Sequence, residues 1–245
     1  MSGIVLSAQD LTVSFGGFRA VDGLNLVVKR NELRCVIGPN GAGKTTLLDM
    51  VCGKTKPTAG TLKFKDLELT KMIEYEITRA GVGRKFQNPS VYEDLTVLEN
   101  LEMSYPKQRG IIGSLFFRRT PDLRRRIDES AEQVYLRDDL DTKAGSLSHG
   151  QKQWLEIGML LMQNPELMLL DEPVAGMSPR EREQTAELLQ KIAPGRCLVV
   201  IEHDMAFVRM IAQTVTVLHQ GRTLAEGTMD EIENDERVID VYLGH

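Results

Sequence analysis

The chain has 245 residues, of which 42% are hydrophobic and 27% are charged, and its net charge is −5. This length suits one large domain or a core with an inserted subdomain, and the negative charge gives no case for nucleic-acid binding. No apolar run approaches the roughly 18 residues of a membrane span, and the N-terminus lacks the segments of a secretory signal.

The cysteines indicate a reducing compartment. They are odd in number, widely spaced and flanked by apolar residues, which favours small buried thiols over a disulfide or metal framework: Cys35, Cys52 and Cys197. We therefore expect a cytosolic protein whose attachment to any membrane depends on partners.

The first part of the chain has the alternation of a β-sheet. Between Val5 and Val28, apolar and polar residues alternate, as in strands with one buried face. Gly16-Gly17 supplies a turn between two such strands, and β character returns from Gly60 to Leu69. This pattern predicts a small antiparallel sheet.

A phosphate-binding pattern, G-x-x-x-x-G-K-[ST], runs from Gly38 to Thr45. The apolar run Leu33–Ile37 before it resembles a buried parallel strand, and the residues after it have helical spacing up to Gly53, where a helix would be capped. Glycines let the backbone N–H groups turn inward around phosphate, Lys44 can reach the β- and γ-phosphates, and the Thr45 hydroxyl can ligate Mg²⁺. The alternative is a glycine-rich turn that only joins strand to helix. The flanking pattern favours a site for a nucleoside triphosphate.

Strand signals are scarce between about residues 88 and 164, which predicts a helical insertion. One helix should begin at Asp94 or Thr96 and include Leu101, and a second should cover Asp122 to Leu136.

A basic run from Arg118 to Arg126 lies in this insertion. It could contact anionic lipid or a partner. The acidic neighbours Asp122, Asp128 and Glu129 favour a solvated helix face instead.

A second candidate phosphate site lies at Leu147-Ser148-His149-Gly150-Gln151. Ser148 is a good N-cap for the apolar helix that follows, and a helix N-terminus attracts anions. One chain thus carries two half-sites for phosphate, which we expect to lie too far apart to hold one nucleotide. A head-to-tail dimer would close each ATP between the phosphate loop of one chain and the Ser148 segment of the other.

Two carboxylates, Asp171 and Glu172, follow the apolar strand Leu167–Leu170. The carboxyl ends of parallel strands share the sheet edge at which ligands bind. There Asp171 is placed to hold Mg²⁺, and Glu172 to deprotonate an attacking water. An acidic turn without a ligand is the alternative for this pair taken alone.

Two further polar residues belong to the same predicted edge. His203 follows the strand Cys197–Ile201 and could donate to the γ-phosphate, and Gln87 could contact Mg²⁺ and the attacking water. Taken alone, either residue could be structural. The alternation of strands and helices predicts the α/β class: a mainly parallel sheet flanked by helices, with an antiparallel side sheet and a helical insertion.

These five motifs, in this order and spacing, resemble the ATP-binding subunit of an ABC transporter over essentially the whole chain. The resemblance implies a P-loop ATPase in a single domain, with a core at 1–87 and 165–245 and a helical insertion at 88–164. It implies ATP and Mg²⁺ as cofactors, with Glu172, His203 and Gln87 in catalysis and Thr45, Gln87 and Asp171 at the metal. The residues implied in nucleotide binding are Phe15 (stacked on adenine, or a core aromatic), Gly38, Pro39, Asn40, Gly41, Ala42, Gly43, Lys44, Thr45, Thr46, Ser148, Gly150 and Gln151.

The same resemblance implies where the subunit works. It would dock on transmembrane permease subunits at the cytoplasmic face of the inner membrane, pair with a second ATPase subunit, and serve a periplasmic solute-binding protein indirectly. The implied activity is ATP hydrolysis that drives solute uptake, with no nucleic-acid partner.

Finer features, such as Phe15-Gly16-Gly17 and the ending Val238–Gly244, resemble the hydrophobic amino-acid uptake branch, especially the ATPase of urea importers. The alternative is a branched-chain amino-acid importer, and more remotely a non-transport ABC ATPase. A small-molecule kinase could share the phosphate loop but has no use for the Ser148 segment.

Two positions depart from the pattern of the family. His149 replaces the usual first glycine of the signature pair, so packing at the dimer interface should differ while phosphate contact survives. Ser178 stands where an aspartate usually follows, which predicts weaker or asymmetric communication between two ATP sites.

Overall fold

The computed structural model describes residues 3–85, 90–106 and 120–243. Gln87, Arg118 and Arg119 lie outside these described residues, so the predictions for them are not tested by the structure.

The predicted antiparallel side sheet is present. Its strand order is β2-β1-β4-β5, and its strands are β1 (Ile4–Phe15), β2 (Phe18–Lys29), β4 (Ala59–Phe64) and β5 (Leu67–Glu68). Phe15 pairs with Phe18, which confirms the turn at Gly16-Gly17. The β segment predicted up to Leu69 is interrupted after Phe64, because Lys65 takes a positive φ of 53° in a turn.

The central sheet has the order β10-β9-β3-β8-β7-β6. Its strands are β3 (Leu33–Ile37), β6 (Val82–Lys85), β7 (Leu167–Asp171), β8 (Cys197–Ile201), β9 (Thr214–His219) and β10 (Arg222–Gly227). All neighbours are parallel except β9 and β10, which form an antiparallel hairpin.

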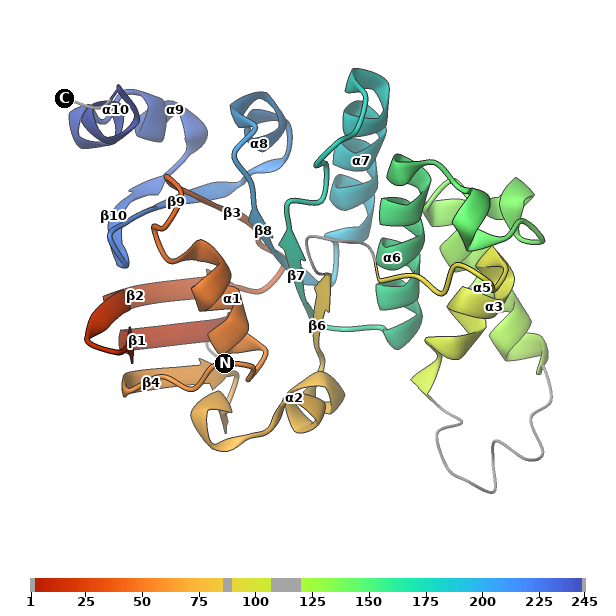
Figure 1. Ribbon diagram of the computed structural model, residues 1–245, viewed down its shortest axis with the longest axis horizontal. Coiled ribbons are helices and arrows are strands. Elements are labelled where there is room, and N and C mark those ends of the chain that lie inside the picture. Colours follow the sequence, from red (N-terminus) through yellow and green to blue (C-terminus); the bar gives the residue numbers. More distant parts are fainter. Residues whose placement is uncertain (1–2, 86–89, 107–119, 244–245) are drawn as a thin grey trace.

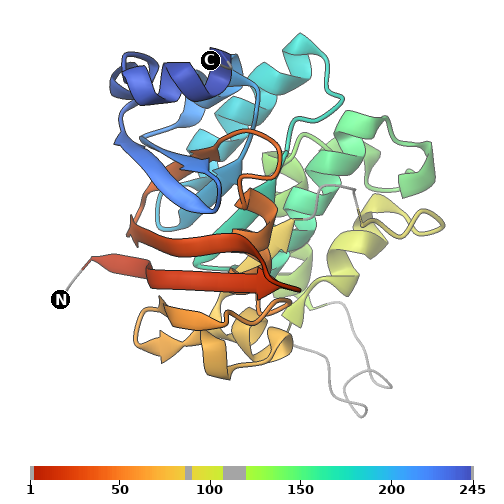
Figure 2. The same ribbon diagram turned by 60° about the vertical axis from the view of Figure 1, so that its left-hand side comes forward.

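Strands β3, β7 and β8 are buried on both faces, which explains their continuous apolar sequences. Because successive side chains of a strand point to opposite faces, Leu167 and Leu169 belong to one core while Met168 and Leu170 belong to the other. The first core lies between the central sheet, helix α1 (Lys44–Val51) and the side sheet, and the second lies under the helices that cover the other face of the central sheet (Figures 1 and 2).

Helices connect and cover these sheets. They are α1 (Lys44–Val51), α2 (Glu74–Ala80), α3 (Val97–Met103), α5 (Pro121–Gln133), α6 (His149–Gln163), α7 (Pro179–Ile192), α8 (Met205–Ile211), α9 (Met229–Glu233) and α10 (Glu236–Leu243), with short 3-10 turns at Leu69–Lys71, Arg137–Asp139 and Ala144–Ser146. None of the helices within the described residues has the length and apolar character to span a membrane.

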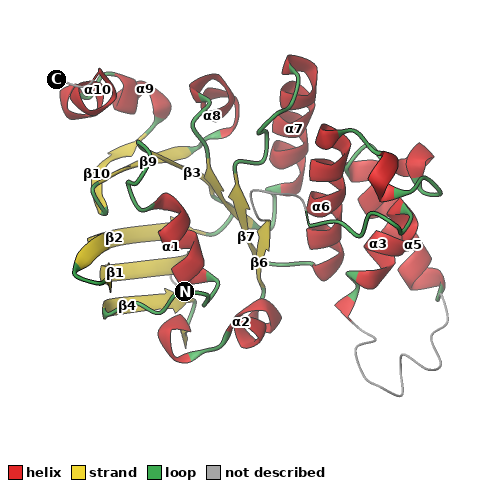
Figure 3. Ribbon diagram, in the orientation of Figure 1, coloured by secondary structure: helices red, strands yellow, loops and turns green. Residues whose placement is uncertain are grey.

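The described residues of the predicted insertion form helices α3, α5 and α6 and contain no strand (Figure 3). Thr96 caps α3 through the N–H of Glu99, which decides between the two predicted starts. Helix α5 ends three residues earlier than predicted, at Gln133, because Tyr135 adopts a φ of 59°. The domain boundaries at residues 88 and 164 stay a prediction.

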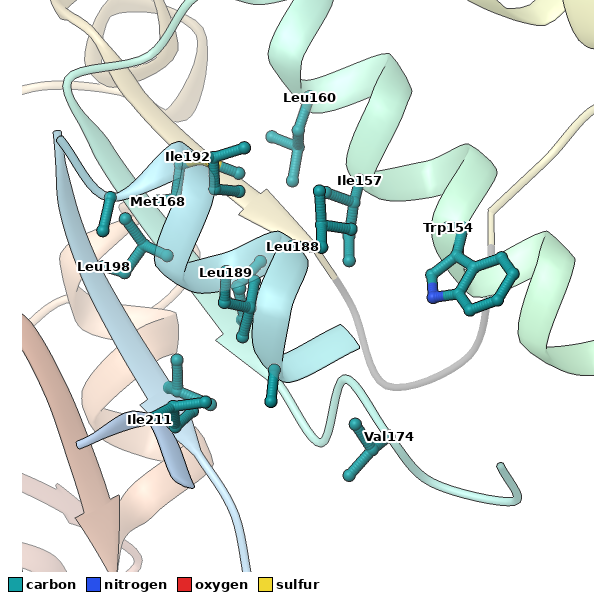
Figure 4. Close-up of a cluster of buried hydrophobic side chains, with 14 of the residues drawn as sticks. Trp154, Ile157, Leu160, Met168, Val174, Leu188, Leu189, Ile192, Leu198 and Ile211 are labelled. Carbon is teal, nitrogen blue, oxygen red and sulfur yellow. The ribbon is translucent and has the colours of Figure 1, made fainter. Parts of the chain in front are cut away.

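The insertion shares its core with the sheet. Trp154, Ile157 and Leu160 of α6 lie in one cluster with Met168 of β7 and Leu188 of α7 (Figure 4). This continuous packing couples the orientation of α6 to the strands that carry the predicted site.

The basic run and the cysteines can now be compared with their predictions. Arg125 on α5 is exposed and pairs with Asp122 and Glu129, as a solvated helix face requires. Cys35 and Cys197 are buried thiols, but the prediction for Cys52 is wrong: its side chain is only partly buried and lies 3.4 Å from Arg84 Nη1.

Candidate functional site

The phosphate loop starts at Gly38, directly after β3, and continues into the first turn of α1 up to Thr46, at the carboxyl edge of the central sheet. Gly38 and Gly43 have φ values of 147° and 99°. A Cβ at Gly38 would overlap the carbonyl of Leu218, and one at Gly43 would lie 2.6 Å from the Ala20 carbonyl oxygen. Only glycine therefore fits these two positions.

Lys44 folds back over this loop. Its Nζ donates to the carbonyl oxygens of Gly38 (2.7 Å) and Pro39 (3.0 Å). Partial burial lowers the pKa of Lys44, and the nearby carboxylates of Glu172 and Asp171 oppose that shift. The predicted phosphate ligand and the two predicted carboxylates thus lie within electrostatic reach of one another.

A cavity of about 360 Å³ opens above the loop. Its lining includes the loop residues from Asn40 to Thr46, together with Phe18, Ala20 and Glu172. Phe15 is 53% exposed, so it is not the core aromatic that was the alternative to adenine stacking. The aromatic that lines this cavity is Phe18, at the other end of the same tight turn.

Asp171 ends β7 as a buried carboxylate. Burial raises its pKa, while the guanidinium of Arg84, 3.3 Å from Oδ2, opposes the shift. Arg84 lies on the neighbouring strand β6 and also pairs with Asp49 of α1. Our sequence analysis missed Arg84. The available indication was a pair of cations, Arg84-Lys85, in a strand placed directly before Gln87.

Glu172 is the first residue after β7, and its N–H donates to the carbonyl of Ile201 on β8 (3.0 Å). Its φ of 46° is rare for a residue with a side chain, and such outliers concentrate at functional sites. His203 Nδ1 lies 3.4 Å from Glu172 Oε1. The structure therefore brings Glu172 and His203 together, as their positions after neighbouring strands predicted.

Glu202 is a second residue of the site that was not predicted from the sequence. It supports both the loop after β7 and the segment after β8. It is 1% exposed, and its carboxylate accepts from the N–H groups of Val174 (3.3 Å) and His203 (3.1 Å). Burial raises the pKa of Glu202, and these backbone donors oppose that shift. A glutamate that directly follows a fully buried strand was the available indication.

The Ser148 segment lies elsewhere. Ser148 caps α6 by accepting from the N–H of Gln151, and the N–H of Ser148 in turn donates to the side-chain oxygen of Gln151. Gly150 faces Glu181 at the start of α7, since a Cβ there would overlap that carboxylate. Ser148, Gly150 and Gln151 are absent from the lining of the cavity above the phosphate loop.

The C-terminal helix α10 contacts the loop from the other side. The Gly38 N–H lies near the Tyr242 hydroxyl, which opposes the rise in the pKa of Tyr242 that burial causes. Tyr242, Ile37 and Met205 line an apolar cavity of about 300 Å³ under α10. The Gly38 carbonyl oxygen is therefore held by Lys44, while Tyr242 lies near the Gly38 N–H.

The residues present suit Mg²⁺ shared with a nucleotide. Mg²⁺ prefers hard oxygen ligands and usually takes only one or two from the protein, the rest coming from water and phosphate. The Thr45 hydroxyl and the Asp171 carboxylate are such donors. No group of three or more His, Cys, Asp or Glu in the described part of the chain could hold a metal by itself.

A glycine loop between a buried strand and a helix, with carboxylates at the ends of neighbouring strands, defines a P-loop nucleoside triphosphatase. Residues 21–175 match the family model described as ABC transporter, and residues 222–245 match that of the branched-chain amino acid ATP-binding cassette transporter. The chain belongs to the ABC transporter ATP-binding family and is an ATPase of that type.

Known relatives agree over the full length. The chain is 36% identical to the high-affinity branched-chain amino acid transport ATP-binding proteins BraF of Pseudomonas aeruginosa and LivG of Escherichia coli K12, covering 100% of this chain and 99% of each relative. A nucleotide-free ATP-binding cassette from an ABC transporter superposes with a TM-score of 0.85 at 29% identity, covering 99% of this chain and 100% of that one. An ADP-bound cassette gives 0.84 at 30% identity, with 99% of both chains covered.

Proposed function

We propose that this chain is the ATP-hydrolysing subunit of an importer for branched-chain amino acids. The observation that carries the proposal is the full-length similarity to LivG and BraF, including the separate match of residues 222–245. These relatives favour the branched-chain alternative over urea, which was our first expectation from sequence.

In this proposal each step of ATP binding and hydrolysis is assigned to particular residues of the chain. Lys44 leaves the Gly38 and Pro39 carbonyls for the β- and γ-phosphates, joined by the N–H groups of the loop. Mg²⁺, held by Thr45, Asp171 and Gln87, neutralises phosphate charge when bound. Glu172 takes a proton from the attacking water, and His203 donates to the γ-phosphate as charge develops there.

We further propose that two ATPase subunits, either two copies or related chains, close head to tail on ATP. The cavity above the phosphate loop does not include Ser148, so the second half-site would come from the partner. A related cassette, 26% identical over 91% of this chain, has been solved as a dimer in a post-hydrolysis state with ADP and Pi. Hydrolysis would reopen the dimer.

Partners and location follow from the same proposal. The motion would pass through the segment from Gln87 to Leu101 to permease subunits, which places the chain at the cytoplasmic face of the inner membrane. A periplasmic solute-binding protein would deliver the solute to the permease.

The deciding experiment compares uptake of labelled leucine and labelled urea in cells that lack this gene. We expect leucine uptake to fall, and to return with the normal gene but not with Lys44→Ala. Loss of urea uptake alone would overturn the proposal that the substrates are branched-chain amino acids. No change in the uptake of leucine or urea would overturn the transport role.

A further inference from the structure

His149 is the first residue of α6 and stands between Ser148 and Gly150. Its imidazole Nε2 lies 3.1 Å from the carbonyl oxygen of Ala175, in the loop that follows Glu172. The ring also lies against Gly176, where an added Cβ would be 3.2 Å from the imidazole Cδ2. A glycine at position 149 has no side chain and could make neither contact.

The two polar groups next to His149 Nε2 decide whether this nitrogen donates or accepts a hydrogen bond. Gln153, one helical turn on and fully buried, brings its amide nitrogen within 3.3 Å of the same Nε2. A ring nitrogen cannot accept from an amide while it donates to a carbonyl. Amide oxygen and nitrogen exchange places by a simple flip, and Gln153 Oε1 has no other partner among the described residues. With the Gln153 amide flipped, an N–H at His149 Nε2 faces two acceptors, the Gln153 side-chain oxygen and the Ala175 carbonyl oxygen. The Ala175 oxygen is the nearer of the two.

The loop that His149 contacts holds Glu172 in its unusual conformation. The N–H of Ala175 donates to the Glu172 carbonyl (3.2 Å), which closes a turn that begins at Glu172, the residue with a φ of 46°. A left-handed conformation is unfavourable for a residue with a side chain, so the surroundings must hold it. Glu202 holds this loop on one side through the N–H of Val174, and His149 holds it on the other.

We infer that His149 is a positioning residue that ties the start of α6 to the Glu172 loop within one chain. Ser148 and Glu172 serve different ATP molecules in a head-to-tail dimer, so the contact links the two sites. A displacement of Ser148 by phosphate would be passed on to Glu172. The inference rests on the roles proposed above for these two residues.

The test compares His149→Gln with His149→Asn. The glutamine amide reaches about as far as Nε2 and keeps a donor, whereas asparagine keeps the amide but is one methylene shorter. His149→Gly removes the side chain altogether. The measurements on the full chain are kcat and KM for MgATP, and hydrogen exchange of the backbone amides in residues 172–178.

We expect His149→Asn and His149→Gly to lower kcat by about two- to tenfold, the usual effect of one hydrogen bond, with KM within about twofold. Exchange in residues 172–178 should rise by a similar factor, and His149→Gln should restore both. Equal melting temperatures of the Asn and Gln variants would exclude a general loss of stability.

Identical kcat and identical exchange in the Asn and Gln variants would overturn the inference. So would a fall in kcat without faster exchange, since the side chain would then act elsewhere. Failure of the proposed function is separate: full turnover by Glu172→Gln would remove the role of Glu172, while the exchange comparison would still decide whether His149 holds the loop.

Discussion

The two candidate phosphate half-sites of this chain are built in different ways. At the phosphate loop, one chain supplies a cavity, a cation and a carboxylate, and backbone glycines shape the loop. At Ser148, one chain supplies only a capped helix start, whose side chains already serve its own helix.

The difference has a functional meaning. The phosphate loop can hold a nucleotide in a single chain, because its ligands converge on one cavity. In the proposed head-to-tail dimer the Ser148 segment would act on a nucleotide brought by another chain, while its His149 and Gly150 lie against its own Glu172 loop and Glu181 of α7. Binding and hydrolysis should therefore respond differently to changes at the two places.

The largest effect should come from Glu172→Gln. Loss of a general base lowers kcat by about 10²–10⁴-fold, while the amide still fits the site. The variant should bind MgATP and accumulate as a closed dimer, which gel filtration with and without MgATP would reveal alongside phosphate release. Turnover close to that of the normal protein would exclude Glu172 as the base.

Lys44→Ala and Ser148→Ala should separate the half-sites. A charge-assisted hydrogen bond contributes about 1.5–3 kcal/mol, so Lys44→Ala should weaken nucleotide binding to the isolated chain by roughly 10- to 100-fold. Ser148→Ala should leave that affinity unchanged and lower turnover. Equilibrium titration with a fluorescent nucleotide measures the first effect, and equal losses of affinity would contradict the assignment.

Arg84→Ala tests the support beneath the phosphate-loop site. Arg84 is 5% exposed between Asp49 and Asp171, and breaking a buried ion pair costs about 3 kcal/mol or more. The melting temperature should fall by roughly 6–12 °C. Arg125→Ala, which removes a pair of similar length on the exposed face of α5, is the matched control and should change it little.

The smallest effect should come from Tyr242→Phe. The change removes only the hydroxyl that lies near the Gly38 N–H, and a neutral hydrogen bond between them would correspond to about a two- to tenfold change in affinity. KM for MgATP should rise by that factor with kcat unchanged. Tyr75→Phe, on the exposed face of α2, is the control, and equal KM values in the two variants would exclude a role for Tyr242 at the loop.

The sequence alone determined the elements whose causes are local. Alternation at Val5–Val28, the apolar run of β3 and the capping residue Ser148 all predicted structure correctly, because side-chain period and capping act over a few residues. It also placed Glu172 and His203 at one sheet edge, since parallel strands end together. The end of α5 was missed, because the positive φ of Tyr135 has no local cause in the sequence.

Only the tertiary structure decided which distant residues support the site. Arg84 meets Asp171, Glu202 holds two loops, Tyr242 meets Gly38, and His149 meets Ala175. Each contact joins residues brought together by strand order and helix packing. A burial pattern states that a residue faces the interior, but not which residue it meets there, because that depends on the register and crossing of whole elements.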